Sequence, residues 1–171
     1  DNFEAIAKTL SLMPFKVTIT QLIDAVEKEK TFPKRLMLIK ALGKLRTNHQ
    51  PDLKFPKNLI FKALDKELNQ YYLLLQAGSY LPDDKRFMLL NKLLHERLTQ
   101  IKEHLFRLLG LIFDPNDLYM AFQGYQSANE ENRAAALELL DNLLKGKWRL
   151  LIMNILDPVS DDKSIATGRQ N

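Results

Sequence analysis

Apolar residues return every three or four positions along the stretch from Asp83 to Phe113. This spacing puts them in one stripe on a helix surface, so we predict a single helix over 83–113 with Asp83 as its N-cap. The stripe consists of Phe87, Leu90, Leu94, Leu98, Ile101, Leu105, Leu108 and Ile112. A stripe this long needs several helices packed along it, and we expect the rest of the chain to supply them.

The same pattern recurs on both sides of this stretch. We predict further helices over 2–13, 56–78, 115–126, 130–144 and 148–156. Between the first two of these we predict one helix capped by Thr18 or Thr20, and a next one with Leu36, Ile39, Leu42 and Leu45 on its inner side. The short turn at 79–82 predicts that the helix before it and the long helix after it form an antiparallel hairpin. Asp114 is the expected N-cap of the helix that Pro115 opens, and Asn129 caps the next one. No stretch shows the alternation of a strand. The expected fold class is therefore all-α, with about eight helices and a long central helical hairpin.

Two parts of the chain share one plan. Thr20–Leu45 and Asn116–Leu143 each read as a short helix, a small turn and a second helix with matching apolar positions. Arg35 and Arg133 hold the same place early in the second helix, one turn ahead of the expected buried residues. This plan resembles HEAT (armadillo-like) repeats, in which helix pairs stack into a curved α-α superhelix. The resemblance implies a structural role for both arginines, and Arg133 is expected to bind a carboxylate such as that of Asp117 or Asp141.

Two segments carry a narrower resemblance. Phe106–Pro115 and Ala136–Leu144 are similar to the C-terminal HEAT-repeat region of bacterial proteins whose membrane part is like ATP/ADP translocases of the major facilitator type. The likeness covers about Leu59–Asp157. It implies a cytoplasmic interaction or regulatory domain at the inner face of the cell membrane, because transport chemistry in that family belongs to the membrane part. The chain starts at Asp1 rather than Met, and we expect it to be a domain of a longer protein.

Composition narrows the classes of function. The chain has 171 residues, 46% of them hydrophobic and 27% charged, which suits one globular domain. We expect that domain to span 1–158, with a disordered tail at 159–171 where apolar residues are nearly absent. The absence of cysteine excludes disulfides, thiol catalysis and cysteine-based metal centres. No apolar run reaches the ~20 residues of a membrane-spanning helix.

No motif for catalysis or cofactor binding is present. The chain lacks G-x-x-x-x-G-K-[ST] and G-x-G-x-x-G, so it has no phosphate-binding loop of those types. His95-Glu96 is half of a zinc-protease motif, but Thr99 stands where the second histidine belongs. We interpret His95 and His104 as residues at the surface or its flank, and Glu96 with Glu103 as part of a solvated face. We therefore expect no enzyme activity, no cofactor and no metal.

Charge is distributed unevenly. The segment from Lys28 to Lys62 holds ten basic residues against two acidic ones, although the whole chain has a net charge of only +4. The residues that we single out as a surface for an anionic partner are Lys34, Lys40, Lys44, Arg46, Lys54 and Lys57. Such an excess attracts nucleic acid or the anionic face of a membrane. A solvated, lysine-rich helix face that binds nothing explains this excess more simply than either partner.

Together these features predict a non-catalytic helical-repeat domain that binds another protein or another part of its own parent chain. The alternative function is nucleic-acid binding through the basic segment 28–62. A third interpretation is docking on an anionic lipid surface. Repeat stacking motivates the first interpretation, and the excess of positive charge motivates the other two.

Overall fold

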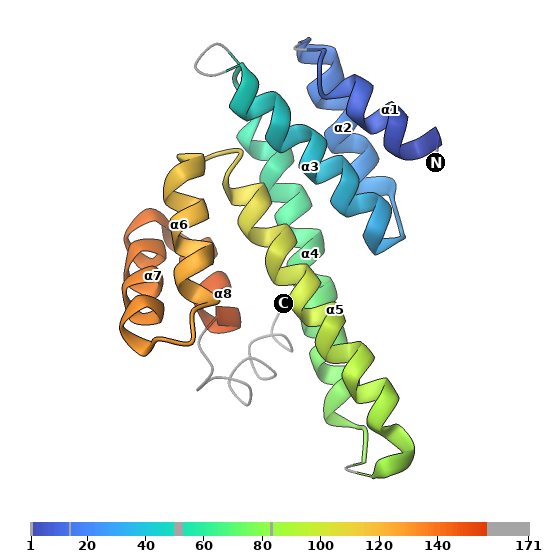
Figure 1. The fold of residues 1–171 in the computed structure, drawn as a ribbon, viewed down its shortest axis with the longest axis vertical. Helices are drawn as coiled ribbons and strands as arrows, with labels where there is room; N and C mark the ends of the chain where they lie inside the picture. The colour runs from blue at the N-terminus through green and yellow to red at the C-terminus, as the bar shows by residue number, and fades with distance from the viewer. Residues whose placement is uncertain (1, 14, 50–52, 83, 157–171) are drawn as a thin grey trace. The chain divides into compact units, whose positions relative to one another are not determined.

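The computed structural model describes residues 2–13, 15–49, 53–82 and 84–156, and helices are the regular structure that it shows there (Figure 1). The elements are α1 (Asn2–Leu10), α2 (Lys16–Lys28), α3 (Phe32–Asn48), α4 (Lys57–Ser79), the 3-10 turn η1 (Lys85–Phe87), α5 (Met88–Leu109), α6 (Pro115–Tyr125), α7 (Glu130–Leu143) and α8 (Gly146–Leu156). No strand occurs in these ranges. The all-α class and the number of helices agree with the pattern of the sequence.

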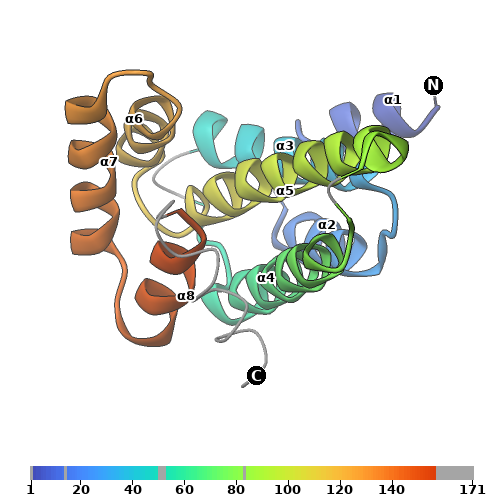
Figure 2. The same cartoon turned by 90° about the horizontal axis from the view of Figure 1, so that it is seen from below.

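The predicted central hairpin is present. Figures 1 and 2 show α4 and α5 lying side by side, joined by a short connection. The helical part of the second arm is shorter than predicted, because η1 occupies 85–87 and α5 begins only at Met88. Asp83, the expected N-cap, lies outside the described residues, and the Asp84 side chain caps η1 instead by accepting from the backbone N–H of Arg86.

Local sequence signals explain several helix ends. The Asp114 carboxylate accepts from the backbone N–H groups of Asn116 and Asp117, and Pro115 opens α6, as predicted. Asn129 caps α7 in the same way. The prediction of Thr18 or Thr20 as N-cap of the second helix is wrong. α2 begins earlier, after Phe15, and both threonines lie inside it.

The helices form two compact units, which divide the central hairpin between them. The first unit comprises Asp1–Lys66 and His104–Tyr119, and the second comprises Glu67–Glu103 and Met120–Asn171. In the first unit α2 and α3 form a helix pair joined at Glu29–Thr31, and α1 packs on α3. In the second unit α7 contacts α8, and Gly124 of α6 lies against Ala136 of α7. The two helix pairs α2–α3 and α6–α7 match the two parts of the sequence that share one plan. The proposed tail at 159–171 lies outside the described residues.

Each unit has its own apolar core. The core of the first unit includes Ile19, Leu22, Ile23, Val26, Ile39, Leu42, Leu45, Ile60, Leu64, Leu105 and Leu108. That of the second includes Leu68, Tyr71, Ile101, Leu140, Ile152 and Ile155. Ile101, Leu105 and Leu108 come from the predicted apolar stripe, and burial of these residues positions the surfaces described next.

Candidate interaction surfaces

The two histidines weighed as metal ligands have different environments. His95 is exposed on α5, whereas His104 is buried in the first unit, with its ring centroid 5.9 Å from that of Phe32. The expectation that both lie at the surface or its flank is therefore wrong for His104, which is a core residue. Glu96 is exposed and Glu103 is half-buried. Over the described ranges, no group of three or more histidine, aspartate or glutamate side chains is arranged to hold a metal ion.

The two repeat arginines both contact aromatic rings. Arg35 is only 1% exposed, and its guanidinium carbon lies 4.8 Å from the centroid of the Phe32 ring. It is thus itself a buried position rather than one that precedes the buried positions. Arg133 is half-buried, and its guanidinium carbon lies 5.4 Å from the Tyr125 ring. The expected pairing with Asp141 is wrong, because Asp141 forms a 2.6 Å ion pair with Arg149.

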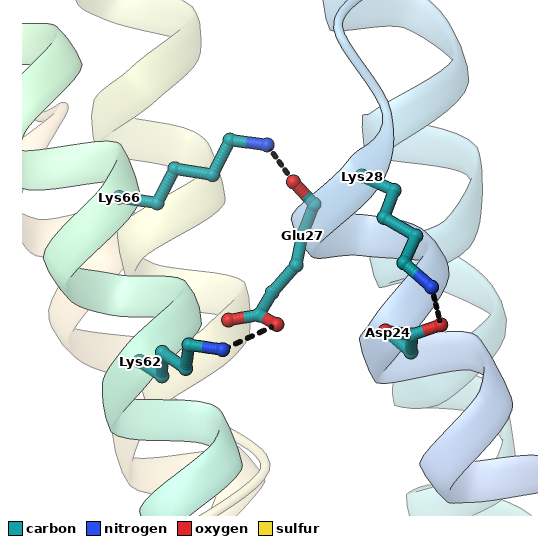
Figure 3. Close-up of polar contacts among 5 residues, drawn as sticks. All are labelled: Asp24, Glu27, Lys28, Lys62 and Lys66. Carbon is teal, nitrogen blue, oxygen red and sulfur yellow. Dashed lines mark hydrogen bonds and ion pairs between the residues drawn. The ribbon is translucent and has the colours of Figure 1, made fainter.

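Part of the positive charge of segment 28–62 is used inside the first unit (Figure 3). Lys62 Nζ lies 3.0 Å from a carboxylate oxygen of Glu27, and Lys66 Nζ donates to the backbone carbonyl of the same residue. Lys28 Nζ pairs with Asp24 at 2.6 Å, and this carboxylate raises the pKa of Lys28. The Glu27 contacts join α2 to α4, so Lys62 serves the fold of the unit more than a partner.

The residues proposed as an anionic-partner surface differ in exposure and in position. Lys40, Lys44, Lys54 and Lys57 are exposed and form no ion pair with any residue that the structure describes. Lys34 is exposed too, but it stands near the opposite end of α3, with its Nζ 5.3 Å from the centroid of the Phe3 ring. The side chain of Arg46 is half-buried and donates to the backbone carbonyl of Leu53, which connects the end of α3 to the segment before α4.

An exposed apolar cluster marks the junction of α1 and α2. Leu12 is 66% exposed and Phe15 is 61% exposed, and Met13 and Val17 are exposed as well. We call Leu12, Met13, Phe15 and Val17 the junction cluster. The predictions from the sequence do not include this cluster, although four apolar residues within six positions around a helix break are a local signal of it.

A second exposed apolar surface lies on α5 near the turn of the hairpin. Leu89 is 78% exposed, Leu93 is 46% exposed, and Leu90 between them is exposed too. Their spacing puts all three within about 100° of the helix circumference. We call these three residues the apolar tip surface. The expectation that neighbouring helices bury the whole stripe from Phe87 to Ile112 is therefore wrong at Leu90.

The aromatic residues of the second unit mainly connect its helices. Lys102 Nζ donates to the Tyr125 hydroxyl at 2.9 Å and lies 5.8 Å from the centroid of the Tyr71 ring, so it joins α4, α5 and α6. The Tyr72 hydroxyl lies 3.5 Å from the backbone carbonyl of Leu151, and burial raises the pKa of Tyr72. These contacts hold the unit together, as expected for rings at helix interfaces. Tyr80 of this unit is, by contrast, exposed, and so is Tyr119 of the first unit.

Comparisons with known proteins add no assignment. No protein-family model, no curated protein and no solved structure matches this chain. Over the described residues, every helix is too short or too polar to cross a bilayer. The two exposed apolar surfaces and the exposed lysines are therefore the features of the protein that bear on its function.

Proposed function

We propose that this chain is a non-catalytic helical interaction domain that binds an amphipathic helix of a partner protein on the apolar tip surface. The observation that carries the proposal is the exposure of Leu89, Leu90 and Leu93 on one side of α5. Contiguous exposed leucines on a folded domain expose apolar area to water at a free-energy cost, and such patches commonly mark binding sites.

The charges around the tip favour a protein over a polyanion. The stretch from Asp83 to Glu96 has three acidic and three basic residues, namely Asp83, Asp84, Lys85, Arg86, Lys92 and Glu96. Asp84 and Arg86 neutralise each other in a 2.8 Å ion pair. A surface with balanced charge exerts little net attraction on nucleic acid or anionic lipid, whereas it suits the mixed rim of a protein interface.

The arrangement also favours a helical ligand. The three leucines follow the i, i+1, i+4 spacing of a helix stripe, and a helix laid beside α5 would cover them by side-chain packing. Met88 and Tyr80 are exposed near the same turn, and methionine and tyrosine are residue types that adapt to and anchor partners. The partner helix would in this way cover the side of α5 that is exposed at this end.

The setting of the domain belongs to the same proposal. The plan shared by α2–α3 and α6–α7 supports HEAT-like stacking, and the resemblance of Phe106–Pro115 and Ala136–Leu144 supports attachment to a transporter-like membrane protein. The domain would then work at the cytoplasmic face of the cell membrane. The reading frame upstream of Asp1 tests this setting: hydrophobic spans there are the expected result, and a frame without them would contradict it.

Site-specific photo-crosslinking in the native cells tests the binding surface. A photoreactive phenylalanine analogue at position 89 is expected to form an adduct with another protein, and mass spectrometry should map the linked residue to an amphipathic helix of that protein. With the mapped helix as a synthetic peptide, the double substitution L89Q and L93Q should weaken binding by about a hundredfold, since each removes a buried leucine contact of ~1–2 kcal/mol.

Leu150 on α8 provides the matched control. It is also a leucine in the second unit, and it is 62% exposed, but it stands outside the apolar tip surface. The analogue at position 150 should give no adduct with the same protein, and L150Q should leave peptide affinity unchanged. Equal adducts at both positions, an adduct only between two copies of this chain, or no adduct at position 89 would each overturn the proposal.

A further inference from the structure

From the first unit we infer a second binding site: the end that carries the junction cluster docks on an anionic lipid bilayer. The basis is the coincidence of exposed apolar side chains with positive charge at one end of this unit. The surface is separate from the apolar tip surface, which belongs to the second unit.

Helix topology brings the relevant residues to one end. Because α2 and α3 are antiparallel and joined by the short turn Glu29–Thr31, the start of α2 at Lys16 lies opposite the last turns of α3 near Lys44. Figure 1 shows the α1–α2 junction, the end of α3 and the start of α4 all at the upper end of the first unit. The hydrogen bond from Arg46 to the Leu53 carbonyl holds the segment that precedes α4 against this end.

The segments that reach this end carry mainly positive charge, with Asp52 as an acidic residue between Lys44 and Lys54 in the sequence. The exposed lysines that stand there are Lys8, Lys16, Lys44, Lys54 and Lys57. No acidic residue occurs between Glu4 and Asp24, and none occurs between Glu29 and Asp52. Each lysine close to an anionic bilayer contributes about 1 kcal/mol of attraction, so five of them produce strong adsorption at physiological salt.

The junction cluster decides between a bilayer and a nucleic acid. Leu12, Met13, Phe15 and Val17 would remain in water on a phosphate backbone and contribute nothing to affinity there. At a bilayer they enter the boundary between headgroups and acyl chains, while the flanking lysines contact the headgroup phosphates. An apolar cluster bordered by Lys8 and Lys16 therefore matches a lipid surface better than DNA or RNA.

Vesicle sedimentation tests the charge requirement. The chain should sediment with vesicles of about 30% phosphatidylserine and not with vesicles of phosphatidylcholine alone, at about 0.15 M salt. The triple variant K44Q, K54Q and K57Q should lower the partition coefficient about a hundredfold, since it removes three contributions of about one kcal/mol each. The control variant K85Q, K92Q and K145Q removes the same charge from exposed sites in the second unit and should bind like the original chain.

A fluorescence measurement tests insertion of the junction cluster. In a chain with W148F and F15W, the single tryptophan replaces Phe15, and its emission should shift to the blue with phosphatidylserine vesicles and be quenched by brominated acyl chains. The W148F chain with F15S should lose vesicle binding severalfold while its circular dichroism stays unchanged. These readouts do not involve the apolar tip surface, so L89Q and L93Q should leave vesicle binding intact.

Several results would overturn the inference. One is a failure to bind anionic vesicles, and another is equal binding to neutral vesicles. Equal losses in the two triple variants would show that binding depends on net charge alone. An unshifted tryptophan at position 15, or tighter binding to a short DNA duplex that F15S leaves unchanged, would assign the basic end to polyanions in general.

Discussion

The two ends of α5 carry the same residue type in opposite environments. Leu105 in the second half of the helix is 1% exposed, and Leu108 and Leu109 are also buried. In the first half, Leu89 is 78% exposed, and Leu90 and Leu93 are exposed too. Leu90 belongs to the same apolar stripe as Leu105 and Leu108, so for this leucine the difference comes from the neighbours alone. Leu89, by contrast, lies about 160° around the helix from Leu105. An apolar stripe therefore indicates that a segment is helical, but it does not indicate whether other helices cover the stripe.

The difference has energetic consequences. A covered leucine contributes about 1.5–3 kcal/mol to folding through burial, and its loss also leaves a cavity. An exposed leucine contributes little to folding, but its apolar area is available to a partner. One end of α5 thus stabilises the fold, and the other end is the surface that we propose for binding. Substitutions at the two ends of α5 test this division of roles.

The largest expected effect comes from truncating a leucine at each end. L105A should lower the free energy of unfolding by about 2–5 kcal/mol, because it opens a cavity in the core of the first unit. L89A should change it by less than about 0.5 kcal/mol, as for most exposed positions. Urea unfolding followed by circular dichroism measures both. Comparable losses in the two variants would show that the tip is covered in solution.

Adding a methyl group where helices are already in contact should cost somewhat less. A Cβ on Gly124 would stand 2.9 Å from the Cβ of Ala136 and 2.9 Å from the backbone oxygen of Asn132. G124A should therefore push α6 and α7 apart and destabilise the second unit by about 1–3 kcal/mol. Thermal unfolding checks this, and a higher melting temperature for G124A would mean that the close contact is absent.

The sequence predicted those features that depend on local chemistry. The cap residues Asp114 and Asn129 were predicted correctly, because a side-chain oxygen and a backbone N–H two or three residues later need no other part of the fold. The hairpin of α4 and α5 followed from two long periodic segments and a short turn. The threonine caps failed because the helical pattern of α2 extends past them, and the Thr20 hydroxyl bonds the carbonyl of Lys16 instead.

Features that depend on distant neighbours were not predicted. His104 and Arg35 are polar residue types, and nothing in their local sequence indicates that both pack against the ring of Phe32. The count of basic residues in segment 28–62 did not reveal that Lys62 is paired with Glu27 on another helix. The junction cluster and the apolar tip surface were not predicted for the same reason, since the exposure of an apolar side chain depends on which helices reach it.

Substitution of a glycine near the apolar tip surface by alanine should change stability in the opposite direction to the same substitution at Gly124. A Cβ on Gly78 of α4 would meet only the Leu94 side chain, at an ordinary contact distance of 3.7 Å. G78A should thus raise stability by about 0.5–1 kcal/mol, because alanine favours the helix and reduces the freedom of the unfolded chain. The melting temperatures of G78A and G124A, measured side by side, should move in opposite directions. A destabilised G78A would indicate tighter packing at the tip than its exposed leucines suggest.

The smallest effect on stability is expected just before α5, next to the apolar tip surface, where local hydrogen bonds take the place of side-chain packing. Hydrogen bonds from Arg86 hold the pKa of Asp84 below its ordinary value, and the Asp84 side chain caps η1. A carboxyl whose pKa is lower in the folded state stabilises that state above its unfolded pKa of about 3.9, and this contribution disappears as the pH falls through the folded pKa. The amide resonance of Arg86, followed by NMR, should therefore titrate at a pH below about 3.9, and the transition should be absent in D84N.

Both groups are exposed to solvent, so the melting temperature of the whole chain should not follow this transition. A global loss of structure at the same pH would mean that the cap stabilises the entire hairpin. The exposed first half of α5 would then be coupled to its buried second half more strongly than the exposure of Leu89, Leu90 and Leu93 indicates.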